Sequence, residues 1–263
     1  MPFRDRIIWI TGASSGIGAA LAVAWSRRGA RLVLSARRED LLQDVRRTCE
    51  RPDDHLVLPL DLTAPDTFAP ATQQVLDHFG RIDLLVNNGG ISQRGFAEDT
   101  DLAVDRRIMA VNYFGSIGLT KAVLPGMLAR GSGRIVVVSS LVGKISTPGR
   151  SAYAASKHAL HGYFNALRAE VADRGVGVTV ICPGFVRTGI SYHALRTDGT
   201  PHGRMDKGQA KGMDVEVFAA RALRAVERGQ DEVMIGGKEV LGVYMFRFLP
   251  RLFNRFVRKV TVT

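Results

Sequence analysis

Short apolar segments alternate with amphipathic helical segments along almost the whole chain, and this alternation constrains the fold more than any other feature. The segments expected to form strands are residues 7–10, 31–35, 55–58, 82–86, 134–138, 177–181 and 232–235. The segments expected to form helices are residues 19–28, 39–49, 68–79, 102–128, 152–173 and 215–227. Strands joined through helices need crossover connections, which give a parallel sheet covered on both faces. We therefore predict one doubly wound α/β domain with a seven-stranded parallel sheet and helices on both faces.

Composition narrows the class of protein further. The chain has 263 residues, of which 46% are hydrophobic and 23% charged, and these ordinary globular values exclude disordered and fibrous classes. Its two cysteines, Cys49 and Cys182, cannot form a disulfide framework, and only six residues precede the first strand-like segment. No apolar run is long enough to span a bilayer. We expect a cytoplasmic protein in a reducing compartment.

The net charge of +11 is typical of proteins that bind nucleic acid, anionic lipid or a phosphate-bearing ligand. Most of the excess is spread over the predicted helix faces, which indicates a solvated surface rather than a nucleic-acid stripe. The exception is residues 238–263, which carry six basic residues and one acidic residue. We expect no nucleic-acid partner.

A glycine-rich turn, TGASSGIG at residues 11–18, follows the first predicted strand. Its spacing is G-x3-G-x-G, which differs from the G-x-G-x-x-G of the general dinucleotide fingerprint. Gly12 permits a tight turn, while Gly16 and Gly18 let a pyrophosphate approach the positive end of the following helix. Glycines also occur in turns for steric reasons alone, but the position between a first strand and a first helix favours a dinucleotide site.

Three further motifs follow in order: NNGG at residues 87–90, YAASK at 153–157 and CPGFVRT at 182–188. Together with the glycine-rich turn they resemble the short-chain dehydrogenase/reductase family over residues 6–235. The resemblance implies a Rossmann-like catalytic domain in residues 1–237, and YAASKHALHGYFNALRAEV is similar to the hydroxysteroid dehydrogenase-like branch. Gly89 departs from the family pattern, which usually has alanine there.

Tyr153 and Lys157 are four residues apart on one predicted helix and therefore lie on the same face. A phenol with an ordinary pKa near 10 is a poor acid or base at neutral pH, and a neighbouring ammonium would lower its pKa. Such pairs are common on helix surfaces, so the resemblance carries the functional prediction. It implies that Tyr153 exchanges the substrate proton, Ser140 binds the substrate oxygen and Asn112 supports a water beside Lys157. An alternative for Asn112 is a hydrogen bond to a neighbouring backbone group.

The second predicted strand is followed by Arg37 and Arg38, with no carboxylate before Glu39. In dinucleotide sites an acid here holds the ribose 2′-hydroxyl, whereas an arginine accommodates a 2′-phosphate. NADP(H) is therefore the predicted cofactor, and a solvated arginine pair at a helix start is the alternative. The cofactor contacts implied by the motifs and the resemblance are Gly12, Ser14, Ser15, Gly16, Ile17, Gly18, Arg37, Arg38, Asp61, Leu62, Asn88, Tyr153, Lys157, Pro183, Gly184, Val186 and Thr188. We expect no metal site, with His158 and His161 in packing or solvent roles.

The reaction implied by the resemblance is hydride transfer between nicotinamide and a carbonyl or secondary-alcohol carbon. The substrate is expected to be a lipophilic small molecule. A catalytically silent cofactor-binding regulator is the alternative, although such proteins usually lack the tyrosine or the lysine, and both are here. The polar stretch at about residues 189–213 is expected to form a substrate lid. The resemblance also implies a homo-dimer or homo-tetramer.

The C-terminal residues 238–263 form a basic amphipathic tail in which Pro250 suits a helix start. One helical face collects Leu252, Phe253, Phe256, Val257 and Val260, and other faces collect Arg251, Arg255, Arg258 and Lys259. Such a segment is typical of helices that lie in a membrane interface. Two alternatives are that the tail covers the substrate cleft or forms a subunit contact.

Overall fold

The computed structural model describes residues 3–258 and contains one seven-stranded, entirely parallel sheet. Its strands are β1 (Ile7–Thr11), β2 (Arg31–Ser35), β3 (Leu56–Val57), β4 (Leu84–Asn87), β5 (Gly133–Val138), β6 (Val176–Pro183) and β7 (Glu232–Ile235). They lie in the order β3-β2-β1-β4-β5-β6-β7, so the direction of winding reverses between β1 and β4. The predicted fold class is confirmed.

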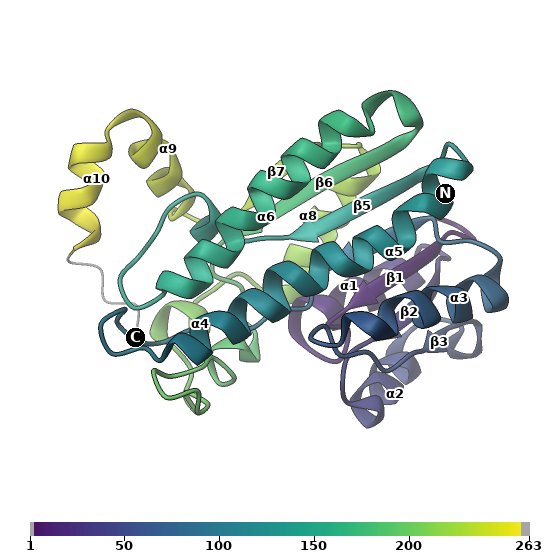
Figure 1. The fold of residues 1–263 in the computed structure, drawn as a ribbon, viewed down its shortest axis with the longest axis horizontal. Coiled ribbons are helices and arrows are strands. Elements are labelled where there is room, and N and C mark those ends of the chain that lie inside the picture. Colours follow the sequence, from purple (N-terminus) through teal and green to yellow (C-terminus); the bar gives the residue numbers. More distant parts are fainter. Residues whose placement is uncertain (1–2, 259–263) are drawn as a thin grey trace.

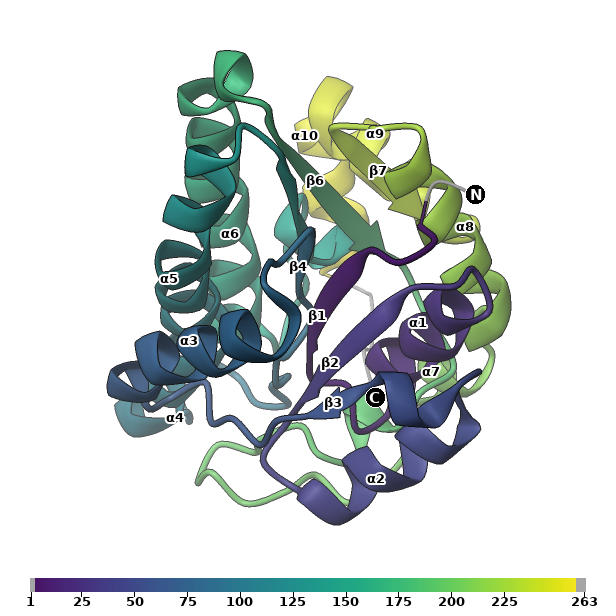
Figure 2. The ribbon, with the colours of Figure 1, turned by 90° about the vertical axis from the view of Figure 1, so that its right-hand side faces the viewer.

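Helices cover both faces of the sheet (Figure 2). The helices on one face are α1 (Gly16–Ser26), α2 (Glu39–Thr48) and α8 (Val215–Glu227). Those on the other are α3 (Phe68–Phe79), α5 (Gly115–Ala129) and α6 (Ser151–Glu170), with α4 (Leu102–Met109) against the start of α6. Because both faces are buried, the strands are apolar at consecutive positions: Ile8 packs toward α1 and α8, while its neighbour Trp9 packs toward α3 and α5.

The predicted helix at residues 102–128 is one helical run with a change of geometry inside it. A π-helical turn at Ala110–Phe114 separates α4 from α5 and contains Asn112. Such turns are rare within helices and are frequent at functional sites. The third strand is shorter than predicted. Beyond its end, the backbone N–H groups of Leu58 and Leu60 still donate hydrogen bonds to Leu34 O and Ala36 O, at the end of β2 and just after it.

The segment at 189–213 crosses the carboxyl ends of the strands and contains the short helix α7 (Lys207–Ala210). It is tied to the segment after β6 through Gln209, whose amide donates to Val186 O and, at 3.2 Å, to Thr188 Oγ1. Its predicted role as a substrate lid stays a prediction.

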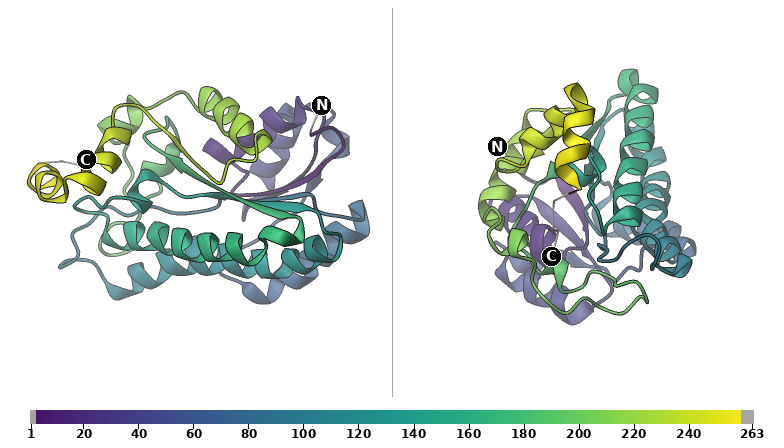
Figure 3. Two further views of the ribbon diagram at one scale, coloured as in Figure 1. Left: turned by 90° about the horizontal axis from the view of Figure 1, so that it is seen from above. Right: turned by 90° about the vertical axis from the view of Figure 1, so that its left-hand side faces the viewer.

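The tail forms two helices, α9 (Val240–Phe248) and α10 (Pro250–Val257), which stand at one end of the molecule (Figures 1 and 3). Phe253 is buried and packs edge-on against Phe246. The helix start at Pro250 is confirmed, whereas Lys259 and Val260 lie outside the described residues. None of the helices within residues 3–258 combines the length and hydropathy needed to cross a membrane.

Candidate active site

A cavity of about 1220 Å³ opens at the carboxyl ends of β1, β2, β5 and β6. Parallel sheets bind ligands at this edge, where the order of the strands reverses. The volume exceeds the roughly 300–1000 Å³ of small-molecule pockets, so a dinucleotide and a substrate could share it. The predicted residues that line it are Gly12, Ser14, Ser15, Gly16, Ile17, Arg37, Arg38, Asp61, Leu62, Asn88, Ser140, Tyr153, Lys157, Pro183, Gly184, Val186 and Thr188. Gly18 and Asn112 do not line it.

The glycines of the turn have different physical tasks. Gly12 and Gly16 have φ angles of +63° and +54°, which side chains rarely adopt. A Cβ on Gly18 would lie 2.2 Å from Gly12 O, so Gly18 serves the packing inside the turn rather than the cavity wall. Helix α1 starts at Gly16, and Ser15 makes no side-chain cap, so its first amides remain open to an anion. This cradle fits a pyrophosphate.

Thr11 and Asn88 hold the ends of β1 and β4 together. The Thr11 hydroxyl accepts hydrogen bonds from the backbone N–H groups of Asn88 and Gly89, at 3.1 and 3.0 Å. The Asn88 amide donates back to Thr11 O at 2.9 Å and to Gly12 O at 3.2 Å. Thr11 is not among the site residues predicted from the sequence, although its place before the first glycine of the turn is a usable signal.

The departure at Gly89 has a steric explanation. A Cβ built there would lie 2.6 Å from Leu62 Cδ1, closer than the contact distance of two carbon atoms. The larger residue that the family usually carries would therefore require this leucine side chain to move.

Arg37 and Arg38 follow the end of β2 and line the cavity there. Burial alone would raise the pKa of Asp61, but hydrogen bonds from Thr63 and the charges of Arg37 and Arg107 lower it overall. The wall here is therefore mixed in charge, with arginines on one side and an ionised Asp61 on the other.

Tyr153 lies on α6 and is 7% exposed. Burial raises the pKa of its hydroxyl above the ordinary value, against the lowering effects of Arg150, a hydrogen bond with Ser140, and Arg94. The expected lowering by Lys157 is therefore wrong for this structure. The Lys157 ammonium lies 5.8 Å from the centre of the tyrosine ring, while its Nζ donates to Val138 O at 2.9 Å.

Burial also lowers the pKa of Lys157 to about 8, with Cys182 acting in the opposite direction. This residue reaches the cavity from one turn further along α6. Its ammonium group is thus close to the middle of its titration at neutral to mildly alkaline pH.

Asn112 uses its side chain to brace the loop after β4. Its Oδ1 accepts from Ile91 N at 2.8 Å, and its Nδ2 donates to Ile91 O and Ser156 Oγ, each at 2.9 Å. Asn112 Oδ1 and Lys157 Nζ both lie beside Gly90. A Cβ on Gly90 would be 3.1 Å from the oxygen and 3.5 Å from the nitrogen. The predicted support of a water stays a prediction.

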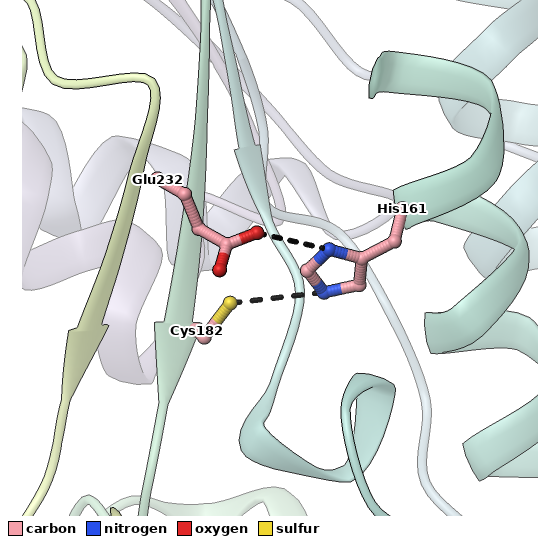
Figure 4. Close-up of side chains that lie close together, drawn as sticks. All are labelled: His161, Cys182 and Glu232. Carbon is pink, nitrogen blue, oxygen red and sulfur yellow. Dashed lines mark hydrogen bonds and ion pairs between the residues drawn. The ribbon is translucent and has the colours of Figure 1, made fainter. Parts of the chain in front are cut away.

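A polar cluster that was not predicted from the sequence joins α6, β6 and β7 (Figure 4). Glu232 lies 3.4 Å from His161 Nδ1, and Cys182 Sγ lies 3.7 Å from Nε2 of the same ring. The carboxylate and the thiol contact opposite ring nitrogens, so the three side chains form a continuous polar chain. The expected absence of a metal site stays a prediction. The hydrogen bond with His161 and the nearby Lys144 lower the pKa of Glu232 to about 2, and burial raises that of Cys182 to about 12.

A second missed cluster joins the segment at 189–213 to the Tyr153 end of the cavity. Asp206 of this segment accepts hydrogen bonds from Arg94, which follows β4, and from Arg150, which precedes α6 and lies at 3.3 Å. All three side chains are at most 8% exposed. Buried charges of this kind are stable only when paired, so Asp206 fastens the segment to the core.

Comparison with known proteins now identifies the family. Residues 6–198 match the family model described as short chain dehydrogenase. The chain is a member of the short-chain dehydrogenase family. It is 45% identical to the Anopheles gambiae dehydrogenase/reductase SDR family protein 7-like, with 97% of this chain and 83% of that protein covered. It is 40% identical to the Rattus norvegicus dehydrogenase/reductase SDR family member 7B, with 97% and 81% covered.

Solved structures agree with the assignment of this chain to the short-chain dehydrogenase family. A short-chain dehydrogenase from Streptomyces avermitilis matches with a TM-score of 0.81 at 30% identity, covering 97% of this chain and 96% of that one. A Burkholderia cenocepacia short chain dehydrogenase in complex with NADP matches with a TM-score of 0.82 at 26% identity, covering 99% and 100%. The family is one of oxidoreductases, and its fold binds nicotinamide cofactors.

Removing the buried carboxylate of Asp206 should destabilise the protein. Asp206→Ala leaves two buried guanidinium groups without their counter-charge, which costs about 3–5 kcal/mol of unfolding free energy. Urea unfolding monitored by circular dichroism measures this loss. The control Asp99→Ala removes an exposed carboxylate and should cost less than about 0.5 kcal/mol. Equal effects of the two substitutions would contradict the fastening role.

Proposed function

We propose that this short-chain dehydrogenase transfers a hydride between NADP(H) and a carbonyl or secondary-alcohol carbon of a lipophilic substrate. The observation that carries the proposal is that Ser140, Tyr153 and Lys157 line the same cavity as the glycine-rich turn. The bound nicotinamide supplies the hydride chemistry, and the protein supplies alignment and proton exchange. The complete set of site residues favours an enzyme over a silent cofactor-binding regulator.

The chain's own residues suit proton donation to a carbonyl oxygen. Because burial raises the pKa of Tyr153, the hydroxyl is protonated at neutral pH and ready to donate. The charges of Arg150 and Arg94 and the hydrogen bond with Ser140 favour the phenolate that donation leaves behind. In this proposal Ser140 also orients the substrate oxygen.

The preference for NADP(H) rests on the arginines after β2. Arg37 and Arg38 line the cavity, and the first carboxylate after the strand, Glu39, lies outside the lining. A guanidinium offers donors that match a phosphate, whereas a carboxylate would repel it. Among the solved structures, the Burkholderia cenocepacia protein is in complex with NADP and a Burkholderia phymatum protein is in complex with NAD, so the arginines carry this part of the proposal.

The lipophilic character of the substrate is supported by the far wall of the cavity. This wall comes from α9, α10 and the segment after β5, and its apolar residues are Ile145, Leu241, Met245, Phe253, Phe256 and Val257. An apolar substrate portion gains about 25 cal/mol for each Å² of surface that it buries there.

The role of Tyr153 is tested by Tyr153→Phe, which keeps the ring and removes the hydroxyl. We expect kcat for reduction of a ketone panel with NADPH to fall by roughly 10²- to 10⁴-fold, the usual contribution of a positioned acid. Binding of NADPH, followed by its fluorescence, should change little. Tyr163→Phe on the same helix is the control and should retain full activity. A fully active Tyr153→Phe variant would exclude the proposed mechanism.

The cofactor preference is tested by Arg37→Asp. Replacing the guanidinium by a carboxylate should lower the ratio of kcat/KM for NADPH over NADH by roughly ten- to a hundredfold or more, because a charge-assisted hydrogen bond is replaced by repulsion. Arg31→Asp makes the same charge change at the exposed start of β2 and should leave the ratio unaltered. A preference for NADH in the unmodified protein would overturn the assignment.

A peripheral membrane contact through the tail is part of the proposal. Side chains that are more than half exposed on or beside α9 and α10 are Leu241, Phe248, Leu249, Leu252 and Phe256. Arginines on the same helices, including Arg247, Arg251 and Arg255, would face anionic headgroups. Because α10 also lines the cavity, a lipophilic substrate could enter from the bilayer.

Vesicle co-sedimentation of the full chain tests this contact. We expect binding to vesicles that contain phosphatidylserine, and at least about a tenfold loss of binding in the double variant Phe248→Glu, Leu252→Glu, since two apolar groups are replaced by charges. Leu102→Glu changes a similarly exposed leucine on α4 and serves as the control. If both variants sediment like the unmodified protein, the tail does not attach to membranes.

A further inference from the structure

The two buried arginines beside the catalytic tyrosine face the cavity, while the carboxylate that holds them does not. Arg94 and Arg150 both belong to the cavity wall, and Asp206 does not. The carboxylate approaches from the lid and lies 3% exposed behind the guanidinium groups. The substrate space therefore meets the positive side of the cluster.

The cluster also carries more positive than negative charge. Asp206 is the one carboxylate ion-paired to either arginine within residues 3–258. The nearby His202 lies 3.5 Å from Asp206, but burial lowers its pKa, which leaves it neutral at pH 7. Two guanidinium charges against one carboxylate leave an excess of +1 in a buried place, which is costly without a further anion.

The other carboxylates of the cavity wall are engaged elsewhere. Asp61 accepts hydrogen bonds from Thr63, beyond β3. Glu239 accepts from the backbone N–H groups of Phe185 and Gly237, at 3.1 and 3.0 Å. The excess charge at the arginines is therefore left for a ligand.

Arg150 in particular is incompletely satisfied by the protein. Its side chain is 8% exposed, its NH2 group makes a single hydrogen bond of 3.3 Å to Asp206, and its Nε has no partner in the described part of the chain. Burial, with repulsion from Arg94, lowers the pKa of Arg150 to about 10, so the charge persists at neutral pH but is poorly compensated.

The two arginines lie near the place where the substrate carbonyl is proposed to bind. Arg150 is the residue before α6, and Tyr153 lies three positions later in the first turn of that helix. Both arginines line the same cavity as Tyr153 and Ser140, and their charges act on the Tyr153 hydroxyl. An anion held by the arginines would thus lie close to a carbonyl held by Tyr153 and Ser140.

We infer that Arg94 and Arg150 form an anion-binding subsite, so that the substrate carries a carboxylate or phosphate monoester close to its carbonyl group. This inference rests on the proposed carbonyl reduction and makes its substrate class specific. A guanidinium pair is well suited to such oxygens because its planar donors match them in pairs. With the apolar wall at α9 and α10, the cavity fits an amphiphilic substrate that has an anionic head.

The test compares pairs of ketones with the same carbon chain between the carbonyl and a terminal group that is anionic in one member and neutral in the other. 4-Oxopentanoate is compared with its methyl ester, and 4-oxopentyl phosphate with 5-hydroxypentan-2-one, as substrates with saturating NADPH. In the unmodified protein we expect kcat/KM for at least one anion to exceed that of its neutral partner by roughly ten- to a hundredfold, as for a charge-assisted hydrogen bond. The two arms distinguish a carboxylate site from a phosphate site.

Arg150→Gln should remove this anion preference, Arg150→Lys should keep part of it, and the control Arg196→Gln, at an exposed position of the lid, should leave it unchanged. The ratio within each variant is the decisive readout, because an arginine that only assists Tyr153 would change both members of a probe pair equally.

Calorimetric binding of the same probes to the protein, with and without saturating NADP⁺, provides a readout apart from turnover. Tighter binding of an anion that Arg150→Gln weakens would support the subsite even for a slow substrate. Reduction of the neutral ketones without any anion preference overturns the subsite and leaves the proposed function intact. If no carbonyl is reduced and the anions bind no better than the neutral probes, both proposals fail.

Discussion

The close approach of the ends of β1 and β4 fixes the geometry of the whole site. The winding of the sheet reverses between these strands, so a crevice opens there by topology alone. Thr11 and Asn88 then fasten the two strand ends through four hydrogen bonds of 2.9–3.2 Å. Gly12 permits the contact, since a Cβ on it would lie 2.8 Å from Gly89 Cα. The cavity therefore depends on backbone proximity that a larger residue at position 12 would prevent.

The fold could be predicted from the sequence because the hydrophobic pattern of each strand and helix is contained in one short stretch of the chain. Residues 135–138 are apolar at consecutive positions because β5 is covered on both faces, and this pattern predicts a buried strand. Motif spacing likewise located Ser140, Tyr153 and Lys157 around one cavity. The π-helical turn around Asn112 could not be predicted, because its hydrogen bonds to Ile91 and Ser156 depend on distant segments.

The direction of the pKa shift of Tyr153 was predicted wrongly for the same reason. The sequence places a cation one helical turn from Tyr153, but it does not show that the phenol is buried or that Lys157 Nζ is directed to Val138 O. Desolvation acts on any ionisable group removed from water and here outweighs the cations nearby. The arginines that oppose it come from residues 94 and 150, which no local pattern connects to the tyrosine.

The segment at 189–213 is linked to Tyr153 through charge. Asp206 reaches the site only because the segment at 189–213 folds over the strand ends, and it partly neutralises the arginines whose field acts on Tyr153. Without this segment in place, two guanidinium groups would lie unpaired beside the tyrosine, so the position of the segment and the charge at the tyrosine are coupled. An anion bound beside the arginines, as inferred above, would supply the negative charge that Asp206 leaves uncompensated. The segment and the inferred anion would then act on the same buried cluster, whose net charge is +1.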